Sequence, residues 1–154
     1  MNIKLLFNNG KKRSALNKII EDFILWITGG LFYFYMEIAF RNYSHYSMII
    51  CGGFCFLIVG KIGEYILERE ANILKAEVLI MFFGALSITS LELFTGIIVN
   101  VIFDMNVWNY SSVKYNVYGQ ICLAYTMIWS LLSLLCVYVF CAIKVFLFKN
   151  KNRT

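Results

Sequence analysis

The residues best suited to chemistry form a short polar series in an otherwise apolar part of the sequence. They are Thr89, Glu92, Gly96 and Asn100, which lie three, four and four positions apart. At about 100° per residue, this spacing places all four within an arc of roughly 80° on one side of a helix. A carboxyl group in such a stripe could take part in binding a small solute or a cation, or it could fix the packing of neighbouring helices.

The helix that must carry this stripe is long enough to cross a membrane. We expect it over residues 77–103, where a rise of 1.5 Å per residue gives a length of about 39 Å. The hydrocarbon core of a bilayer is about 30 Å thick, so Glu92 is predicted to lie near its midplane. An ionisable group at that depth is costly and normally faces protein or a water-filled cavity.

The composition of the whole chain points to the same environment. Of its 154 residues, 60% are hydrophobic, 18% are aromatic and only 15% are charged, and the mean hydropathy is +0.70. Soluble proteins carry about 25% charged residues, so soluble enzymes, nucleic-acid modules and disordered regulators are excluded. We predict an all-α integral membrane protein, a bundle of four transmembrane helices over residues 20–40, 47–67, 77–103 and 118–148.

Lysine and arginine residues predict the orientation of this bundle. With the N-terminus inside, only Arg41 and Lys114 of the 14 Lys and Arg residues lie outside, so both termini are expected in the cytoplasm. The predicted organisation is a basic arm (1–18), the transmembrane domain (19–148) and a basic tail (149–154) in the plasma membrane. The net charge of +5 then needs no nucleic-acid partner to explain it. The lipid bilayer is the expected surrounding.

Further polar residues gather toward the outer ends of the helices, where they could line a vestibule. Glu37 is followed by Arg41 one helical turn later, so a mutual ion pair is an equal alternative to a functional role. Capping and interfacial solvation are favoured for the others, which are Asp104, Asn116 and Gln120. Near the opposite end, Glu64 is interpreted as part of a solvated rim with Lys61 and Glu68.

Small residues and cysteines are interpreted as packing elements. Glycines such as Gly29, Gly52 and Gly60 allow close approach of transmembrane helices. The five cysteines all lie in apolar runs without a disulfide pattern. Cys51 and Cys55 are one turn apart and could supply half a metal site, but no further ligand accompanies them. We therefore expect neither a metal nor another cofactor.

Several sequence elements together resemble a known bacterial family. They include the run from Glu92 to Gly96, Val99 with Asn100, the run from Val107 to Ser111, Asn116, the run from Gly119 to Cys122, and Trp129. His45 to Met48 with Gly52, Gly53 and Gly60 extends the similarity to the second helix. Over about residues 30–130 the chain is similar to the putative ABC transporter type IV family. This resemblance implies a permease-like membrane subunit, and Asn109 stands where the family usually has Asp.

Three functions of different classes follow from these observations. The first is a transport component, assembled as an oligomer, that admits a small solute or a cation to a cavity lined by Glu92, Thr89, Asn100, Glu37 and Gln120. The second is a non-transporting scaffold or regulator of a membrane partner, in which Glu92 and the outer-loop motif fix packing or recognise that partner. This motif comprises Trp108, Asn109, Tyr110, Ser111 and Asn116.

An intramembrane enzyme is the least favoured class. The sequence contains no Ser/His, Cys/His or paired-aspartate helix motif, and acid catalysis needs a second positioned group. It also lacks the Gly-rich phosphate loop that ends in Lys and Ser or Thr, so it has no ATP-hydrolysing site of that kind. The aromatic side chain of Trp108 is expected either at the headgroup level or folded back over the bundle.

Overall fold

The structure, a computed structural model, describes residues 15–149, so most of the predicted basic arm and tail lie outside the described residues. The chain runs through α2 (Ala15–Arg41), α3 (Tyr46–Arg69) and α4 (Ile73–Gly96), and α4 continues as the π-helix η1 (Ile97–Ile102). A hairpin of β1 (Asn116–Val117) and β2 (Ile121–Cys122) then precedes α5 (Leu123–Ile143) and the π-helix η2 (Lys144–Lys149). All four predicted helices are present, each long and apolar enough to cross a membrane.

The start of the last helix differs from the prediction. Residues 116–122 form a hairpin in which Asn116 pairs with Cys122, so the helix begins at Leu123 and not near residue 118. The hairpin turns through Tyr118 (φ +51°) and Gly119 (φ +67°), which takes the chain out of the helical region. The third helix also begins earlier than expected because the Asn72 side chain caps it, accepting from the Leu74 amide at 3.1 Å.

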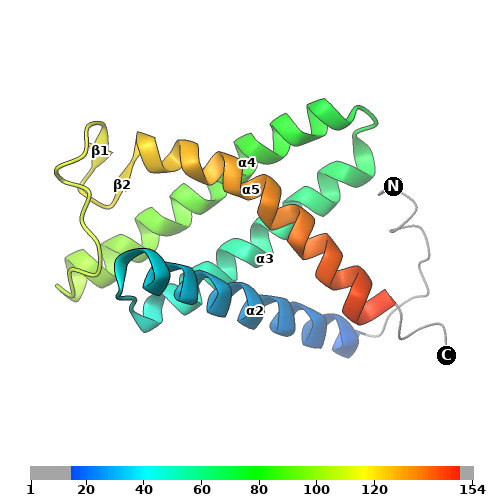
Figure 1. The fold of residues 1–154 in the computed structure, drawn as a ribbon, viewed down its shortest axis with the longest axis horizontal. Coiled ribbons are helices and arrows are strands. Elements are labelled where there is room, and N and C mark those ends of the chain that lie inside the picture. Colours follow the sequence, from blue (N-terminus) through cyan, green and yellow to red (C-terminus); the bar gives the residue numbers. More distant parts are fainter. Residues whose placement is uncertain (1–14, 150–154) are drawn as a thin grey trace.

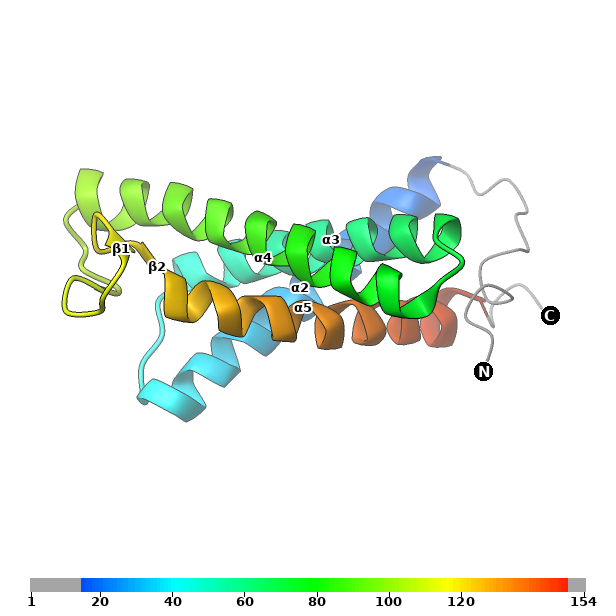
Figure 2. The same cartoon turned by 90° about the horizontal axis from the view of Figure 1, so that it is seen from above.

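The four helices alternate in direction and cross one another (Figures 1 and 2). The start of α2, the α3–α4 turn and the end of α5 lie at one end of the molecule. The α2–α3 turn and the segment 103–122 lie at the other, which we call the outer end (Figure 1). An ion pair of 3.5 Å between Glu21 and Lys144 joins the first and last helices. The structure thus confirms the all-helical class with four helices long and apolar enough to span a membrane, and both described ends lie at the same end of the molecule.

Glycines allow α2 and α3 to pack closely, as the sequence predicts. A Cβ atom added at Gly52 would lie only 2.6 Å from the Cβ of Tyr33, so a larger residue would push the two helices apart. The α3 helix contacts α2, α4 and α5, which makes it the centre of the bundle. The core is filled by buried apolar side chains from all four helices, including Leu25, Val59, Ile80, Val137 and Phe140.

The second helix begins with a histidine to which the sequence assigns no role. His45 precedes α3 in an extended conformation, and its Nδ1 accepts a hydrogen bond of 3.2 Å from the Ser47 amide. This satisfies one of the donors left free in the first turn of a helix. Its position is therefore explained by capping.

Candidate functional site

The predicted polar stripe on the third helix faces α5. Thr89 Oγ1 lies 3.1 Å from Thr126 Oγ1, and the indole Nε1 of Trp129 donates to Glu92 Oε2 at 2.7 Å. Glu92 is buried, with 4% of its surface exposed, as the sequence predicts. We call this line of contacts between α4, η1 and α5 the polar seam.

Helix geometry explains why Glu92 meets a residue so far along α5. Side chains in an α-helix point toward its N-terminus, and α4 and α5 run in opposite directions. The Glu92 and Trp129 side chains therefore lean toward each other from different levels. A long indole spans the remaining gap, which places a neutral donor beside the carboxyl group.

The space beside Gly96 is occupied by a side chain from the outer end. A Cβ atom added at Gly96 would lie 2.5 Å from Gln120 Oε1 and 3.1 Å from the Trp108 ring. Gly96 is thus required for close approach, as predicted for the small residues. In this conformation Gln120 fills the space next to the glycine.

Asn100 is the centre of the outer part of the seam. Its Nδ2 donates to the Trp108 carbonyl at 3.0 Å and to Gln120 Oε1 at 2.8 Å, while its Oδ1 accepts from the Val107 amide at 2.6 Å. Asn100 lies within η1, where the Phe103 amide bonds to the Ile98 carbonyl five residues back. Single π-helical turns of this kind occur frequently at functional sites.

Trp108 folds back over the bundle, which is one of the two positions expected for it. Its surface is only 6% exposed, and its Nε1 donates to the Gln120 carbonyl at 2.9 Å. Gln120 in turn donates from Nε2 to the Tyr118 carbonyl at 3.0 Å. Together Asn100, Trp108 and Gln120 form a closed cap over the outer end of the seam.

The rest of the outer-loop motif shapes the loop itself. Asn109 Oδ1 accepts from the Ser111 amide at 2.8 Å, which is an Asx turn, and Asn116 Nδ2 donates to the Val113 carbonyl at 2.7 Å. The Tyr110 ring stacks on Tyr125 of α5 with 4.6 Å between ring centres. Burial raises the pKa of Tyr110, so this phenol stays protonated.

Glu37 is held by two residues near the end of α2. Its Oε1 is 3.3 Å from Arg41, and its Oε2 accepts from the Ser44 hydroxyl at 2.6 Å. The structure thus contains the mutual pair that the sequence offered as one alternative. Arg41 also donates to the Val107 carbonyl at 2.9 Å, which attaches the end of α2 to the outer segment. The structure brings Thr89 and Glu92 against α5 and Asn100 against Gln120 of the hairpin, while the ion-pair and hydrogen-bond partners of Glu37 are Arg41 and Ser44.

A second polar cluster lies at the opposite end, where sequence reasoning expects a solvated rim. Lys61 of α3 pairs with Asp22 of α2, and Lys144 lies 2.6 Å from Glu64 and 3.5 Å from Glu21. These five residues come from three helices that are far apart in the sequence. A signal was present in Glu21 and Asp22, two adjacent acids at the start of an apolar run.

The fold and the seam define a multi-pass helical membrane protein with a buried carboxyl group between its last two spans. The chain matches the family described as Putative ABC-transporter type IV over residues 19–153, and it belongs to that family. This confirms the resemblance seen in the sequence and extends it almost to the C-terminal end. Comparisons with curated proteins and with solved structures gave no match.

Proposed function

We propose that this chain is the membrane-spanning component of a transport system and that a small cation or polar solute engages Glu92 within the polar seam. The supporting observation is the position of Glu92, which is the only charged residue in the stretch 78–103 and is nevertheless buried. A neutral side chain could accept the Trp129 hydrogen bond at lower cost in a membrane. A carboxyl group in its place favours a role that uses its charge.

The contacts also suggest how such a group could be reached. The Asn100–Trp108–Gln120 cap covers the outer end of the seam, and Gln120 fills the space beside Gly96. A solute from the outer side would reach Glu92 after this cap separates from η1. Because the sequence lacks a phosphate-binding loop, ATP hydrolysis in an ABC-type system would come from a separate protein.

The scaffold function remains the second candidate because of the seam itself. Thr89, Glu92 and Asn100 each have a hydrogen-bond partner across the interface, as residues that fix helix packing would. In that case Glu92 would hold α4 against α5, and the outer segment would be available to a partner protein. The two functions differ in whether water enters the seam.

Cysteine accessibility distinguishes them without knowledge of the solute. In a variant lacking the five native cysteines, Thr126→Cys places a thiol in the seam and Thr28→Cys places one on the exposed side of α2. A hydrated path would allow the thiol at position 126 to ionise and to react with a small charged thiosulfonate. The control thiol at position 28, which faces lipid, would stay unreactive. Lack of reaction at both positions would contradict a transport path.

The functional variants complete this test. If Glu92 binds a cation or a solute, Glu92→Gln folds but loses activity, whereas a structural Glu92 tolerates glutamine in both respects. A fully stable and fully active Glu92→Leu variant would contradict both roles.

We also propose an orientation with both termini in the cytoplasm, so a cysteine at Lys114 should react with an impermeant reagent in intact cells and one at Lys151 should not.

A further inference from the structure

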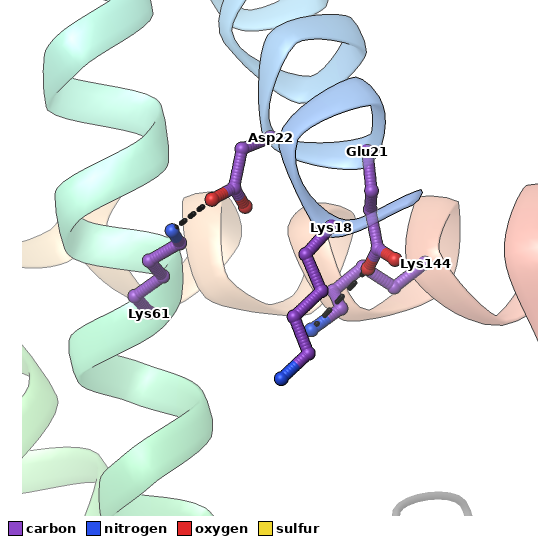
Figure 3. Close-up of a pocket in the computed structure, with 5 residues that line it drawn as sticks. All are labelled: Lys18, Glu21, Asp22, Lys61 and Lys144. Atoms are coloured by element: carbon purple, nitrogen blue, oxygen red, sulfur yellow. Dashed lines mark hydrogen bonds and ion pairs between the residues drawn. The ribbon is translucent and has the colours of Figure 1, made fainter. Parts of the chain in front are cut away.

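The charged cluster at the end opposite the cap encloses a pocket. Its volume is about 200 Å³, and α2, α3 and the start of η2 contribute the lining residues Lys18, Glu21, Asp22, Lys61 and Lys144 (Figure 3). Nothing in the proposed transport role uses these side chains. The pocket therefore needs an explanation of its own.

The charges in the pocket leave one cation available. Lys61 is paired with Asp22, and Lys144 is paired with Glu64 and Glu21. Figure 3 shows the ammonium group of Lys18 extending past the Glu21–Lys144 pair. Within residues 15–149, no ion pair joins Lys18 to a carboxylate. An anionic group that entered the pocket could thus bind Lys18 without displacing an existing pair.

Helix lengths place this pocket at the level of lipid headgroups. The 21 residues of α5, from Leu123 to Ile143, extend about 31 Å at 1.5 Å per residue. The segment of α2 from Asp22 to Arg41 extends about 30 Å by the same rise. Both lengths match one hydrocarbon core of about 30 Å, so Asp22 and Lys144 lie at its edge.

Apolar side chains next to the pocket are open to the surroundings. On the same two turns of α2 as Lys18 and Asp22, Ile19 is 64% exposed and Phe23 is 59% exposed. A molecule with a charged head in the pocket could place hydrocarbon against these residues. This combination fits a phospholipid.

We propose that the pocket binds the headgroup of a phospholipid that carries both a phosphodiester and a primary ammonium group. Lys18 would donate to the phosphate, and Asp22 would accept from the ammonium group. A carboxylate can accept about four hydrogen bonds, so the pair with Lys61 does not exhaust Asp22. The proposal is independent of any role for Glu92.

The balance of charge selects this headgroup over two others. Among residues 15–149, Glu21, Asp22 and Glu64 offset the three lysines, which disfavours a headgroup that carries only negative charge. A quaternary choline group carries no N–H donor for Asp22. An ethanolamine headgroup supplies both a charged phosphate and three donors.

Competition among lipids with identical acyl chains tests the proposal. The purified full chain is mixed with equal amounts of ethanolamine, glycerol and choline phospholipids, and the retained lipid is measured by native mass spectrometry. We expect ethanolamine lipid to be retained about threefold or more over each of the others, which corresponds to one or two weak ion pairs. Lys18→Met, which removes the charge and leaves the identified ion pairs intact, should lower the retention of all three lipids, because each carries the phosphate. Asp22→Asn, which removes the acceptor charge for the ammonium group, should abolish the preference for ethanolamine lipid.

A matched lysine serves as the control. Lys75 pairs with Glu70 at 2.8 Å in the α3–α4 turn and does not line the pocket, so Lys75→Met should retain the preference. Equal or better retention of glycerol lipid would show non-specific attraction to basic residues and overturn the proposal. Unchanged retention of all three lipids by Lys18→Met would do the same. If that variant does not fold, the Tm of the wild-type chain is measured in each lipid. The proposal requires a higher Tm in ethanolamine lipid than in choline lipid.

Discussion

The polar seam and the charged pocket hold polar groups in the same bundle by different means. In the seam, the single carboxyl group of Glu92 is held by the neutral indole of Trp129, and the remaining groups are amides and hydroxyls. In the pocket, full charges from three helices pair directly, as in Lys144 with Glu64. The charged pocket balances full charges with one another, whereas the middle of α4 holds one carboxyl group with an uncharged partner.

The largest effect is expected where a charge is changed within the seam. Glu92→Lys introduces a larger cation at a depth where insertion of a lysine costs about 2.5–3.5 kcal/mol, without a carboxylate to pair with. We expect little or no monodisperse protein after detergent extraction. Glu92→Gln keeps the shape and an acceptor for Trp129, so its yield should match that of the wild type. Equal yields of both variants would show that the seam tolerates charge.

A smaller loss is expected from the pocket, where water can compensate. Lys144→Met leaves Glu21 and Glu64 facing each other without their shared cation. Because the Lys144 side chain is 21% exposed, we expect a loss of about 1–3 kcal/mol in the free energy of unfolding, less than for a sealed pair. Denaturant titration would measure it. Adding Glu64→Gln should recover part of the loss, and no recovery would argue against charge repulsion as the cause.

Loss of one neutral hydrogen-bond donor should lower the free energy of unfolding by less than loss of the Lys144 charge. Trp129→Phe keeps an aromatic ring but removes the hydrogen bond to Glu92 Oε2, for an expected loss of about 1–2 kcal/mol. Trp26→Phe is the matched control, because the Trp26 Nε1 is buried without a hydrogen-bond partner. The two variants can be compared by thermal unfolding in the same detergent. An equal loss in both would show that ring packing, and not the hydrogen bond, matters in the seam.

The smallest effect belongs to a surface pair outside both regions. The hydrogen bond from Lys75 lowers the pKa of Glu70 in the α3–α4 turn. The stabilisation by this pair is therefore present above the pKa of glutamate in the unfolded chain. It is lost as the pH falls through the lower pKa of Glu70 in the folded chain. Glu70→Gln should lower Tm slightly at pH 7, and the difference from wild type should vanish in acid. A difference that grew in acid would contradict this sign.

The sequence was sufficient to predict the polar stripe of the third helix because its residues repeat along that helix. The spacing of Thr89, Glu92, Gly96 and Asn100 places them on one side of α4 whatever that side contacts. Their partner helix could not be read from this spacing. Trp129 lies in an apolar run, and only the packing of α4 against α5 brings its indole to Glu92.

The pocket and the outer hairpin were missed for different physical reasons. Asp22 and Lys61 are 39 positions apart, and no helical periodicity relates two residues on separate helices. The predicted helix extended back to residue 118, but Gly119 and Tyr118 adopt positive φ and turn the chain into a hairpin. Both features depend on tertiary contacts, which override local preference.

The peptide groups of Val107 give the outer segment a mechanical role. Its amide donates to Asn100 of η1, and its carbonyl accepts from Arg41 at the end of α2. A single residue of the loop is thereby tied to the first and third spans at once. If α2 were to tilt, Arg41 would displace Val107, and Val107 would in turn displace Asn100 and the cap. No contact between α2 and Glu92 would be required. The outer segment thus works as a tether, through which a change at the first helix could open or hold shut the interface between the last two.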